Sequence, residues 1–244
     1  MQFRILLCVA LVFAVRAKTE DLTLKIPPVK TSIDVKGQAV AITAWGDISR
    51  VAPDHFKLAL TADLSEFQQN IGPVLAAALN RSDRCGERLS VERASLMPAA
   101  PAALLTANVH YERWGCVKAF GKEVVKRLVG GNGVVTVKLT PSVSADGITM
   151  SSEVQKIDAD GSLGELLRSG SLGATVKEKI AGSIQSAIRK GLDLKSTLPP
   201  AVQAAAAIQS VQFAGSAEGR LSISVGGEVH ISAAQFESLA KQVP

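Results

Sequence analysis

The feature that most constrains the fold is a series of paired segments in which apolar and polar residues alternate. Alternation with a period of two is typical of half-buried β-strands, and a short turn between two such segments predicts an antiparallel hairpin. One of the turns contains Asp146-Gly147, a strong hairpin signal. The paired strands are predicted at 39–48 with 55–62, 87–97 with 104–114, 134–140 with 147–157, and 207–214 with 220–232. Two further extended segments, 22–26 and 29–35, flank Pro27-Pro28.

Between the hairpins the apolar period changes from two to that of a helix. Apolar residues over 64–79 follow helical spacing, with a break or kink expected near Gly72-Pro73. A small bridging helix is predicted within 122–133, where the glycines of the GGNG segment would end it. Helices therefore separate the predicted hairpins.

The longest helical region is predicted from Ser162 to about Leu194. Its apolar stripe from residue 172 onward contains Val176, Ile180, Ile184 and Ile188. A stripe of this length needs a long apolar partner, and the hairpin faces provide one. We therefore expect an α+β fold, in which a curved antiparallel sheet of long hairpins wraps around one long and one shorter amphipathic helix.

The order strand–strand–helix–strand–strand is predicted twice, at about 38–114 and 133–231. The two units share a pattern and not a sequence, so a duplicated unit is a hypothesis. We expect one domain over 18–244, because a chain of this length can bury one substantial core.

Residues 1–17 have the pattern of a secretory signal peptide. Arg4 precedes an apolar run at 5–15, and Val15 and Ala17 occupy the small-residue cleavage positions. We expect cleavage after Ala17 and a periplasmic or secreted location. This run is too short to span a bilayer, and no later run approaches the roughly 20 residues that a membrane helix needs, so no integral membrane segment is expected after cleavage.

The charge balance gives no indication of a nucleic-acid partner. The chain has 27 Lys and Arg against 22 Asp and Glu, a net charge of +5. Removal of 1–17 takes away Arg4 and Arg16, which leaves 25 basic against 22 acidic residues and a net charge of +3. This excess is small, and aromatic residues are not interleaved with basic clusters as a single-strand binder would require.

Two cysteines, Cys85 and Cys116, remain after the expected cleavage. In an oxidising compartment an even pair is expected to be bridged, and two free buried thiols are the alternative. A disulfide between them is therefore predicted.

The register of the second hairpin supports this bridge. Its apolar faces align best when facing residue numbers sum to 200, which pairs Leu89 with Tyr111 and Val91 with Val109. The two cysteine numbers sum to 201, so they miss each other by one residue. A β-bulge at Gly115 would absorb that residue.

No catalytic or metal-binding motif is found. His55, His110 and His230 lie in three separate extended segments without zinc-site spacing, so we expect no metal and no cofactor. No G-x-S-x-G elbow and no nucleophile with a base are visible, so no enzymatic activity is expected. The GGNG segment follows a predicted helix and precedes a strand, the reverse of a phosphate loop.

The end of the predicted long helix carries a resemblance. It runs into TLPPAV, and IQSVQFAGSAEGRLSISVGGEVHIS follows. With the long hairpins, this order resembles the tubular lipid-binding (TULIP) superfamily, which includes the bactericidal/permeability-increasing proteins and small periplasmic proteins. The resemblance covers element order over 38–232 and no residue-specific motif. It implies a curved antiparallel sheet around a long helix, with an apolar tunnel for lipid tails.

We therefore expect a non-enzymatic protein that binds or carries a lipid or other hydrophobic ligand in an apolar groove or tunnel. The expected lining consists of Val109, Tyr111, Val137, Leu139, Val176, Ile180, Ile184, Ile188, Leu221 and Ile223. The same aliphatic residues could instead fill a tight core. The alternative function is that of an envelope scaffold, interaction or inhibitor protein, which would bind a protein partner through sheet edges or loops without a small-molecule ligand.

Overall fold

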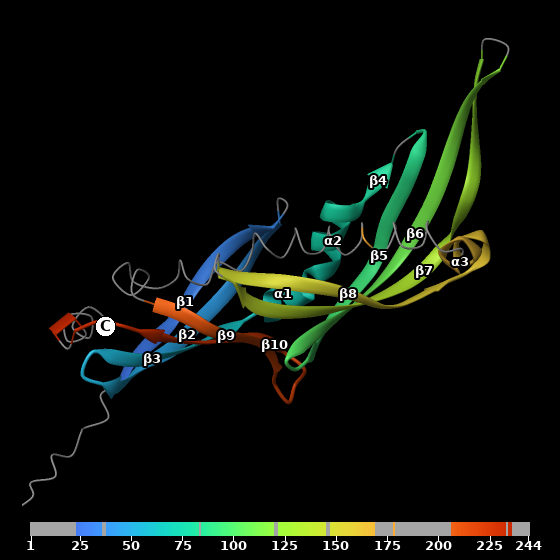
Figure 1. The fold of residues 1–244 in the computed structure, drawn as a ribbon. Coiled ribbons are helices and arrows are strands. Elements are labelled where there is room, and N and C mark those ends of the chain that lie inside the picture. The colour runs from blue at the N-terminus through green and yellow to red at the C-terminus, as the bar shows by residue number, and fades with distance from the viewer. Residues whose placement is uncertain are drawn as a thin grey trace, which may run out of the picture.

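The computed structural model describes residues 23–35, 38–82, 84–119, 122–144, 147–168, 178, 206–232 and 234–235. In this part of the chain the fold is mostly β and consists of two five-stranded antiparallel sheets (Figure 1). In spatial order, the strands of the first sheet are β1 (Thr23–Val35), β2 (Gln38–Ala52), β3 (His55–Asp63), β10 (Leu221–Val229) and β9 (Ala206–Gly215). Those of the second sheet are β4 (Arg81–Ser82), β5 (Gly86–Ala99), β6 (Ala102–Ala119), β7 (Lys122–Ser144) and β8 (Gly147–Ala159).

The predicted hairpins are confirmed, because each pair of alternating segments forms an antiparallel pair of strands. The two extended segments around Pro27-Pro28 form one strand, β1, whose pairing with β2 shifts register between Ile26 and Val29. A proline cannot donate to a strand ladder, so an edge strand with an irregularity is the place where two prolines are tolerated.

The predicted α+β class is wrong for the described residues. Their helices are short: α1 (Ser65–Gln69), α2 (Ile71–Leu79) and α3 (Gly161–Arg168). The strands form two sheets and not a single sheet wrapped around a long and a shorter helix. Residues 169–205, apart from Glu178, lie outside the described residues, and so does most of the predicted long helix.

The small helix predicted within 122–133 is also wrong, because this segment is the first part of β7. Its apolar residues are mainly valines, whose branched side chains fit a pleated strand better than a helix. Pairing with β6 over Lys122–Val129 decides between the two conformations, and the glycines of GGNG lie within the strand.

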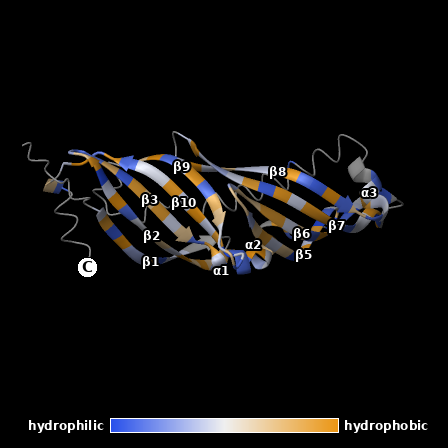
Figure 2. Ribbon diagram, turned by 90° about the horizontal axis from the view of Figure 1, so that it is seen from below, coloured by the Kyte–Doolittle hydropathy of each residue, from blue (hydrophilic) through white to orange (hydrophobic). Residues whose placement is uncertain are grey.

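One apolar core connects the inner faces of both sheets. Along β10 buried and half-buried residues alternate without interruption, and along β3 buried residues alternate with half-buried or exposed ones. Figure 2 shows this alternation as successive bands of hydrophobic and hydrophilic residues across both sheets. The largest fully buried side chains include Phe56 and Leu58 of β3, Leu105 of β6, Leu139 of β7 and Leu221 of β10.

The two sheets lie end to end, with α1 and α2 at their junction (Figures 1 and 2). Gln68 of α1 joins β5 to the β9–β10 hairpin there: its amide nitrogen donates to the carbonyl oxygens of Leu96 at 2.8 Å and Gly219 at 3.0 Å, and its amide oxygen accepts from the Leu221 N–H at 2.9 Å. A further backbone hydrogen bond runs from the Phe213 N–H to the Pro101 oxygen at 2.9 Å. These contacts hold the ends of β5, β9 and β10 together.

Candidate functional site

The β6–β7 hairpin projects beyond the rest of the second sheet (Figure 1). The ladder between β5 and β6 ends at the pair Gly86–Trp114, and the ladder between β7 and β8 ends at Gly133–Ala159. Among the described residues, 115–119 and 122–129 therefore pair only with each other. We call residues 113–129 the arm.

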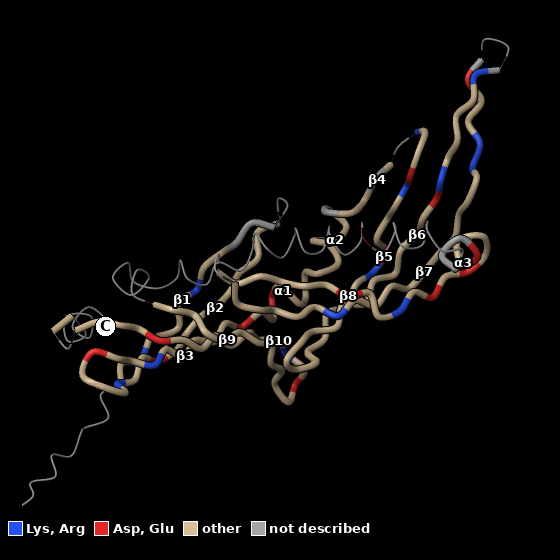
Figure 3. Tube along the Cα trace, viewed as in Figure 1, with Lys and Arg blue, Asp and Glu red and all other residues tan. Residues whose placement is uncertain are grey.

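The arm is strongly basic. Arg113, Lys118, Lys122, Lys126 and Arg127 are opposed by one acidic residue, Glu123, which gives the arm a net charge of 5 − 1 = +4. The whole chain has a net charge of only +5. Figure 3 shows these charges along the hairpin. Most of the excess positive charge of the protein is therefore concentrated on one projection.

One face of the arm also exposes three apolar side chains, which we call the apolar patch. Val117 and Val124 face each other across the ladder and are 66% and 51% exposed. Leu128 is 58% exposed and is the extra residue of a bulge, because Arg113 pairs with Val129 and Trp114 with Arg127. Exposed apolar side chains that cluster and border on charges are typical of interaction surfaces.

Gly115 makes room for this patch. A β-carbon at position 115 would lie 3.1 Å from Cδ1 of Leu128, so the Leu128 side chain rests directly over the glycine. The predicted role of Gly115 as the site of a bulge in β6 is therefore wrong. The bulge lies opposite, in β7, and the glycine accommodates its side chain.

The other face of the arm is fastened to the start of β5. The predicted disulfide between Cys85 and Cys116 is confirmed, with 5.6 Å between the two α-carbons. The guanidinium of Arg84 also forms an ion pair with Glu123 at 3.2 Å. A two-stranded ribbon is marginally stable in water by itself, so these links hold the arm to the sheet.

The predicted register of the β5–β6 hairpin is confirmed from Gly86 to Val91, with Leu89 opposite Tyr111 and Val91 opposite Val109, and it shifts by one residue between Val91 and Arg93. The one-residue offset between Cys85 and Cys116 is made up outside the ladder, because Cys85 lies in a bend that precedes β5. The following Gly86 has a φ of 135°, a backbone conformation that favours glycine. This bend brings Cys85 level with Cys116.

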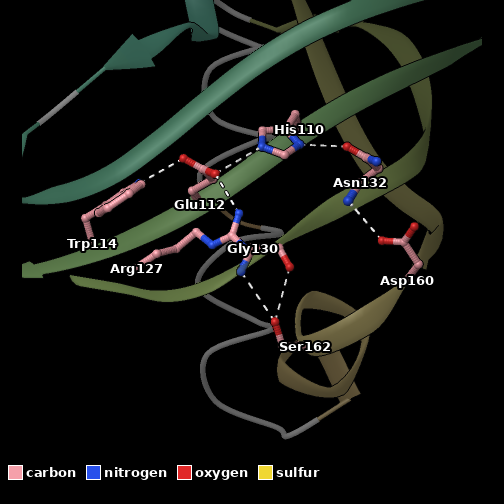
Figure 4. Close-up of polar contacts among 8 residues, drawn as sticks. All are labelled: His110, Glu112, Trp114, Arg127, Gly130, Asn132, Asp160 and Ser162. Carbon is pink, nitrogen blue, oxygen red and sulfur yellow. Dashed lines mark hydrogen bonds and ion pairs between the residues drawn. The ribbon is translucent and has the colours of Figure 1, made fainter.

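A polar network stabilises the base of the arm (Figure 4). The Glu112 carboxylate accepts hydrogen bonds from Trp114 Nε1 at 2.8 Å and from Arg127 Nη1 at 3.1 Å. These bonds, that of Trp114 first, hold the pKa of Glu112 below its usual value. The guanidinium of Arg88 lies 4.4 Å from the centre of the Trp114 ring, a cation–π contact. The Trp114 side chain is thereby held between Arg88 of β5 and Glu112 of β6.

The network continues through His110 to α3. Nδ1 of His110 donates to the side-chain oxygen of Asn132 at 2.7 Å, and Nε2 lies 3.4 Å from Glu112. The hydrogen bond to Asn132, followed by that to Glu112, raises the pKa of His110. The Asn132 N–H donates to Asp160 Oδ1 at 3.0 Å, and the Ser162 hydroxyl donates to the Gly130 oxygen at 3.1 Å. The start of α3 is thus tied to the strand that carries the arm.

A pocket of about 380 Å³ lies next to this network, between β5, β6, β7 and β8. It is lined by Glu92, Asn108, Val109, Asn132, Gly133, Val134, Asp158, Ala159 and Asp160. Three carboxylates and two amides make this lining too polar for an acyl chain, so the pocket does not match the predicted apolar groove.

The predicted lining residues fall into two groups. Six lie in strands and are 0–7% exposed: Val109, Tyr111, Val137, Leu139, Leu221 and Ile223. They come from both sheets and face the interior. The other four, Val176, Ile180, Ile184 and Ile188, lie outside the described residues. Of these six residues, Val109 lines the polar pocket described above.

The arm itself was not predicted as a site. Its signal in the sequence is the presence of basic residues interspersed with apolar ones on both sides of Phe120-Gly121. The chain-wide net charge does not reveal this signal, because a sum over the whole chain carries no information on where the basic residues lie. No helix in the described ranges is both long and apolar enough to cross a membrane. Comparisons with protein-family models, curated proteins and solved structures found no match.

Proposed function

We propose that this protein is a non-enzymatic lipid-binding protein that attaches to anionic membrane surfaces through its arm. The observation that carries the proposal is the combination, on one projecting hairpin, of a net charge of +4 with three exposed apolar side chains. Stable attachment to a membrane surface generally requires two signals, and basic residues beside apolar ones supply both.

The expected energies support such attachment. Each Lys or Arg near an anionic lipid surface contributes about 1 kcal/mol. Complete burial of a Val or Leu side chain contributes about 1.5–3 kcal/mol. Each side chain of the apolar patch is already partly buried, so its insertion into the membrane surface would contribute only part of this energy. Several such contributions together exceed the roughly 4 kcal/mol that corresponds to millimolar binding.

The arm is also suited to this role by its attachment. The Cys85–Cys116 disulfide lies on the face of the arm opposite the apolar patch, and the Glu112 network lies at its base, so both leave the patch uncovered. A fixed ribbon loses little conformational entropy when it meets a surface, because its backbone is already ordered. The disulfide agrees with an extracellular or periplasmic location, which the predicted signal peptide also favours.

Sedimentation with lipid vesicles tests the proposal. We expect binding to vesicles of phosphatidylglycerol and phosphatidylcholine, weak binding to phosphatidylcholine alone, and a loss of binding as salt is raised. Val117→Asp/Val124→Asp and Lys118→Glu/Lys126→Glu should each weaken binding by about tenfold or more, since 1.4 kcal/mol corresponds to a factor of ten.

Matched controls lie on the first sheet. Val51 is 64% exposed, close to Val117, so Val51→Asp removes an equally exposed valine far from the arm. Lys25→Glu/Lys30→Glu makes the same charge change as the arm double variant on exposed lysines of β1. Equal losses in control and arm variants, or equal binding to neutral and anionic vesicles, would contradict the proposal.

Carriage of a lipid inside the protein is a second candidate. It is favoured by the six predicted lining residues that face the interior from both sheets. Native mass spectrometry of protein purified from its natural compartment should then show a bound lipid that organic extraction removes. A lipid-free protein that also fails to bind a fluorescent fatty acid would contradict this candidate, while leaving surface attachment to be judged by the vesicles.

A further inference from the structure

Two histidines and one glutamate meet at the end of the first sheet. His55 is the first residue of β3, and His230 directly follows β10. The β3–β10 register pairs Val229 with Phe56 and Glu228 with Lys57, and its continuation places His230 opposite His55. Residues 175 positions apart in the sequence therefore become cross-strand neighbours.

All three side chains point away from the core. Phe56 and Val229, which alternate with them along the strands, are completely buried. By contrast, the side chains of His55, Glu228 and His230 are 34%, 33% and 63% exposed. The centres of the two imidazole rings are 4.9 Å apart. The cluster thus lies on the outer face, where an ion can reach it from solvent.

The distances match those required for a shared metal ion. Nε2 of His55 lies 3.2 Å from Oε2 of Glu228, and Nε2 of His230 lies 3.8 Å from the same oxygen. One ligand atom from each residue lies within 4.8 Å of the others. In a tetrahedral zinc site with bonds of about 2.0–2.2 Å, neighbouring ligand atoms are ~3.3 Å apart. Small side-chain rotations would therefore bring all three atoms into coordination distance.

We propose that His55, Glu228 and His230 bind one divalent transition-metal ion of the zinc class, with water completing the coordination. Two imidazoles and a carboxylate suit Zn²⁺, Ni²⁺ and Cu²⁺, whereas Mg²⁺ and Ca²⁺ prefer sites made only of oxygen. The second group of close ligand side chains in the described residues contains Cys85 and Cys116, which are bonded to each other and so cannot bind a metal as thiolates.

The metal would link the N-terminal and C-terminal parts of the first sheet. It would join the beginning of β3 to the end of β10, at the point where their ladder ends. Ion pairs of Glu228 with His55 and with His230 would also account for the two contacts to its carboxylate, without a metal. Zinc binding that depends on all three side chains therefore distinguishes a metal site from ion pairs alone.

Isothermal titration of the protein with zinc chloride tests the site. We expect binding of one Zn²⁺ per chain and no heat with Mg²⁺. Loss of an outer-shell partner alone weakens metal binding on the order of 10- to 100-fold, so loss of a direct ligand in His55→Ala or His230→Ala should weaken Zn²⁺ binding by at least this much. The melting temperature should rise with zinc concentration in the unchanged protein and in neither variant.

Two control variants keep the three ligands. His110→Ala removes the remaining histidine, which lies on the other sheet beside Asn132 and Glu112. Lys57→Ala removes a neighbouring cation from the same face. Both should bind Zn²⁺ as tightly as the unchanged chain.

Glu228→Gln provides a third ligand variant of nearly identical shape, and it keeps the test decisive if either histidine variant fails to fold. The proposal is overturned if the unchanged protein gives no zinc heat, or if zinc binding persists undiminished in the folded ligand variants.

Discussion

Phe56→Ala is expected to lower the free energy of unfolding by about 3–5 kcal/mol. Phe56 has no exposed surface and lies in β3, where its register partners are Arg50 of β2 and Val229 of β10. Aromatic residues make up only 4% of the chain, and the surrounding core is mainly aliphatic. Removal of the ring would leave a cavity that short aliphatic side chains fill poorly. Urea denaturation followed by circular dichroism measures the loss.

The next residue supplies the control. Lys57 alternates to the outer face and is exposed, so Lys57→Ala should change stability by less than about 0.5 kcal/mol. If Phe56→Ala cost no more than Lys57→Ala, position 56 would not lie in the core, and the inner face assigned to the first sheet would be wrong.

Loss of the Cys85–Cys116 bridge is expected to cost about 3–4 kcal/mol. The two cysteines are 31 residues apart in the sequence, and in the chain-entropy model a loop of this length, once opened, restores that much conformational freedom to the unfolded state. The variant Cys85→Ser/Cys116→Ser avoids a leftover free thiol. Chemical denaturation of the variant and of the unchanged protein, with and without reductant, measures the difference.

The same change should loosen the arm more than the rest of the molecule. Amide hydrogen exchange should become faster at 115–119 of β6, while the amides of β10 on the other sheet keep their relative protection. An unchanged exchange rate at 115–119 would show that the Glu112 network and the Arg84–Glu123 ion pair are sufficient to fasten the arm. Reductant should have no effect on the stability of the serine variant.

The strands and hairpins could be predicted because their signals are local. Each hairpin brings together residues that are close in sequence, so alternation and turn residues determine both the strands and their register. The pairing of Leu89 with Tyr111 was predicted on this basis and is confirmed. The assembly of hairpins into two sheets could not be predicted in the same way, because β3 pairs with β10 across more than half of the chain.

The segment from Lys122 to Val129 shows that the spacing of apolar residues does not always distinguish a helix from a strand. Val124, Val125 and Leu128 satisfy a helical spacing as well as a strand with one bulge, and only the partner strand decides between them.

For the candidate site, the disulfide could be predicted from the expected compartment and the register. The basic arm and the His55–Glu228–His230 cluster could not, because each depends on which strands lie side by side.

The pairing of β3 with β10 also determines the order in which the protein can fold. The second sheet is continuous in sequence, from Arg81 to Ala159, so it can form as soon as that segment has been synthesised. The first sheet cannot, because the inner edge of β3 stays open until residues 221–229 arrive. During this interval β3 presents an unpaired, largely apolar edge to the other chains around it. β10 thus decides when the edge of β3 is closed: only a chain synthesised as far as Val229 covers the edge at which it would otherwise aggregate.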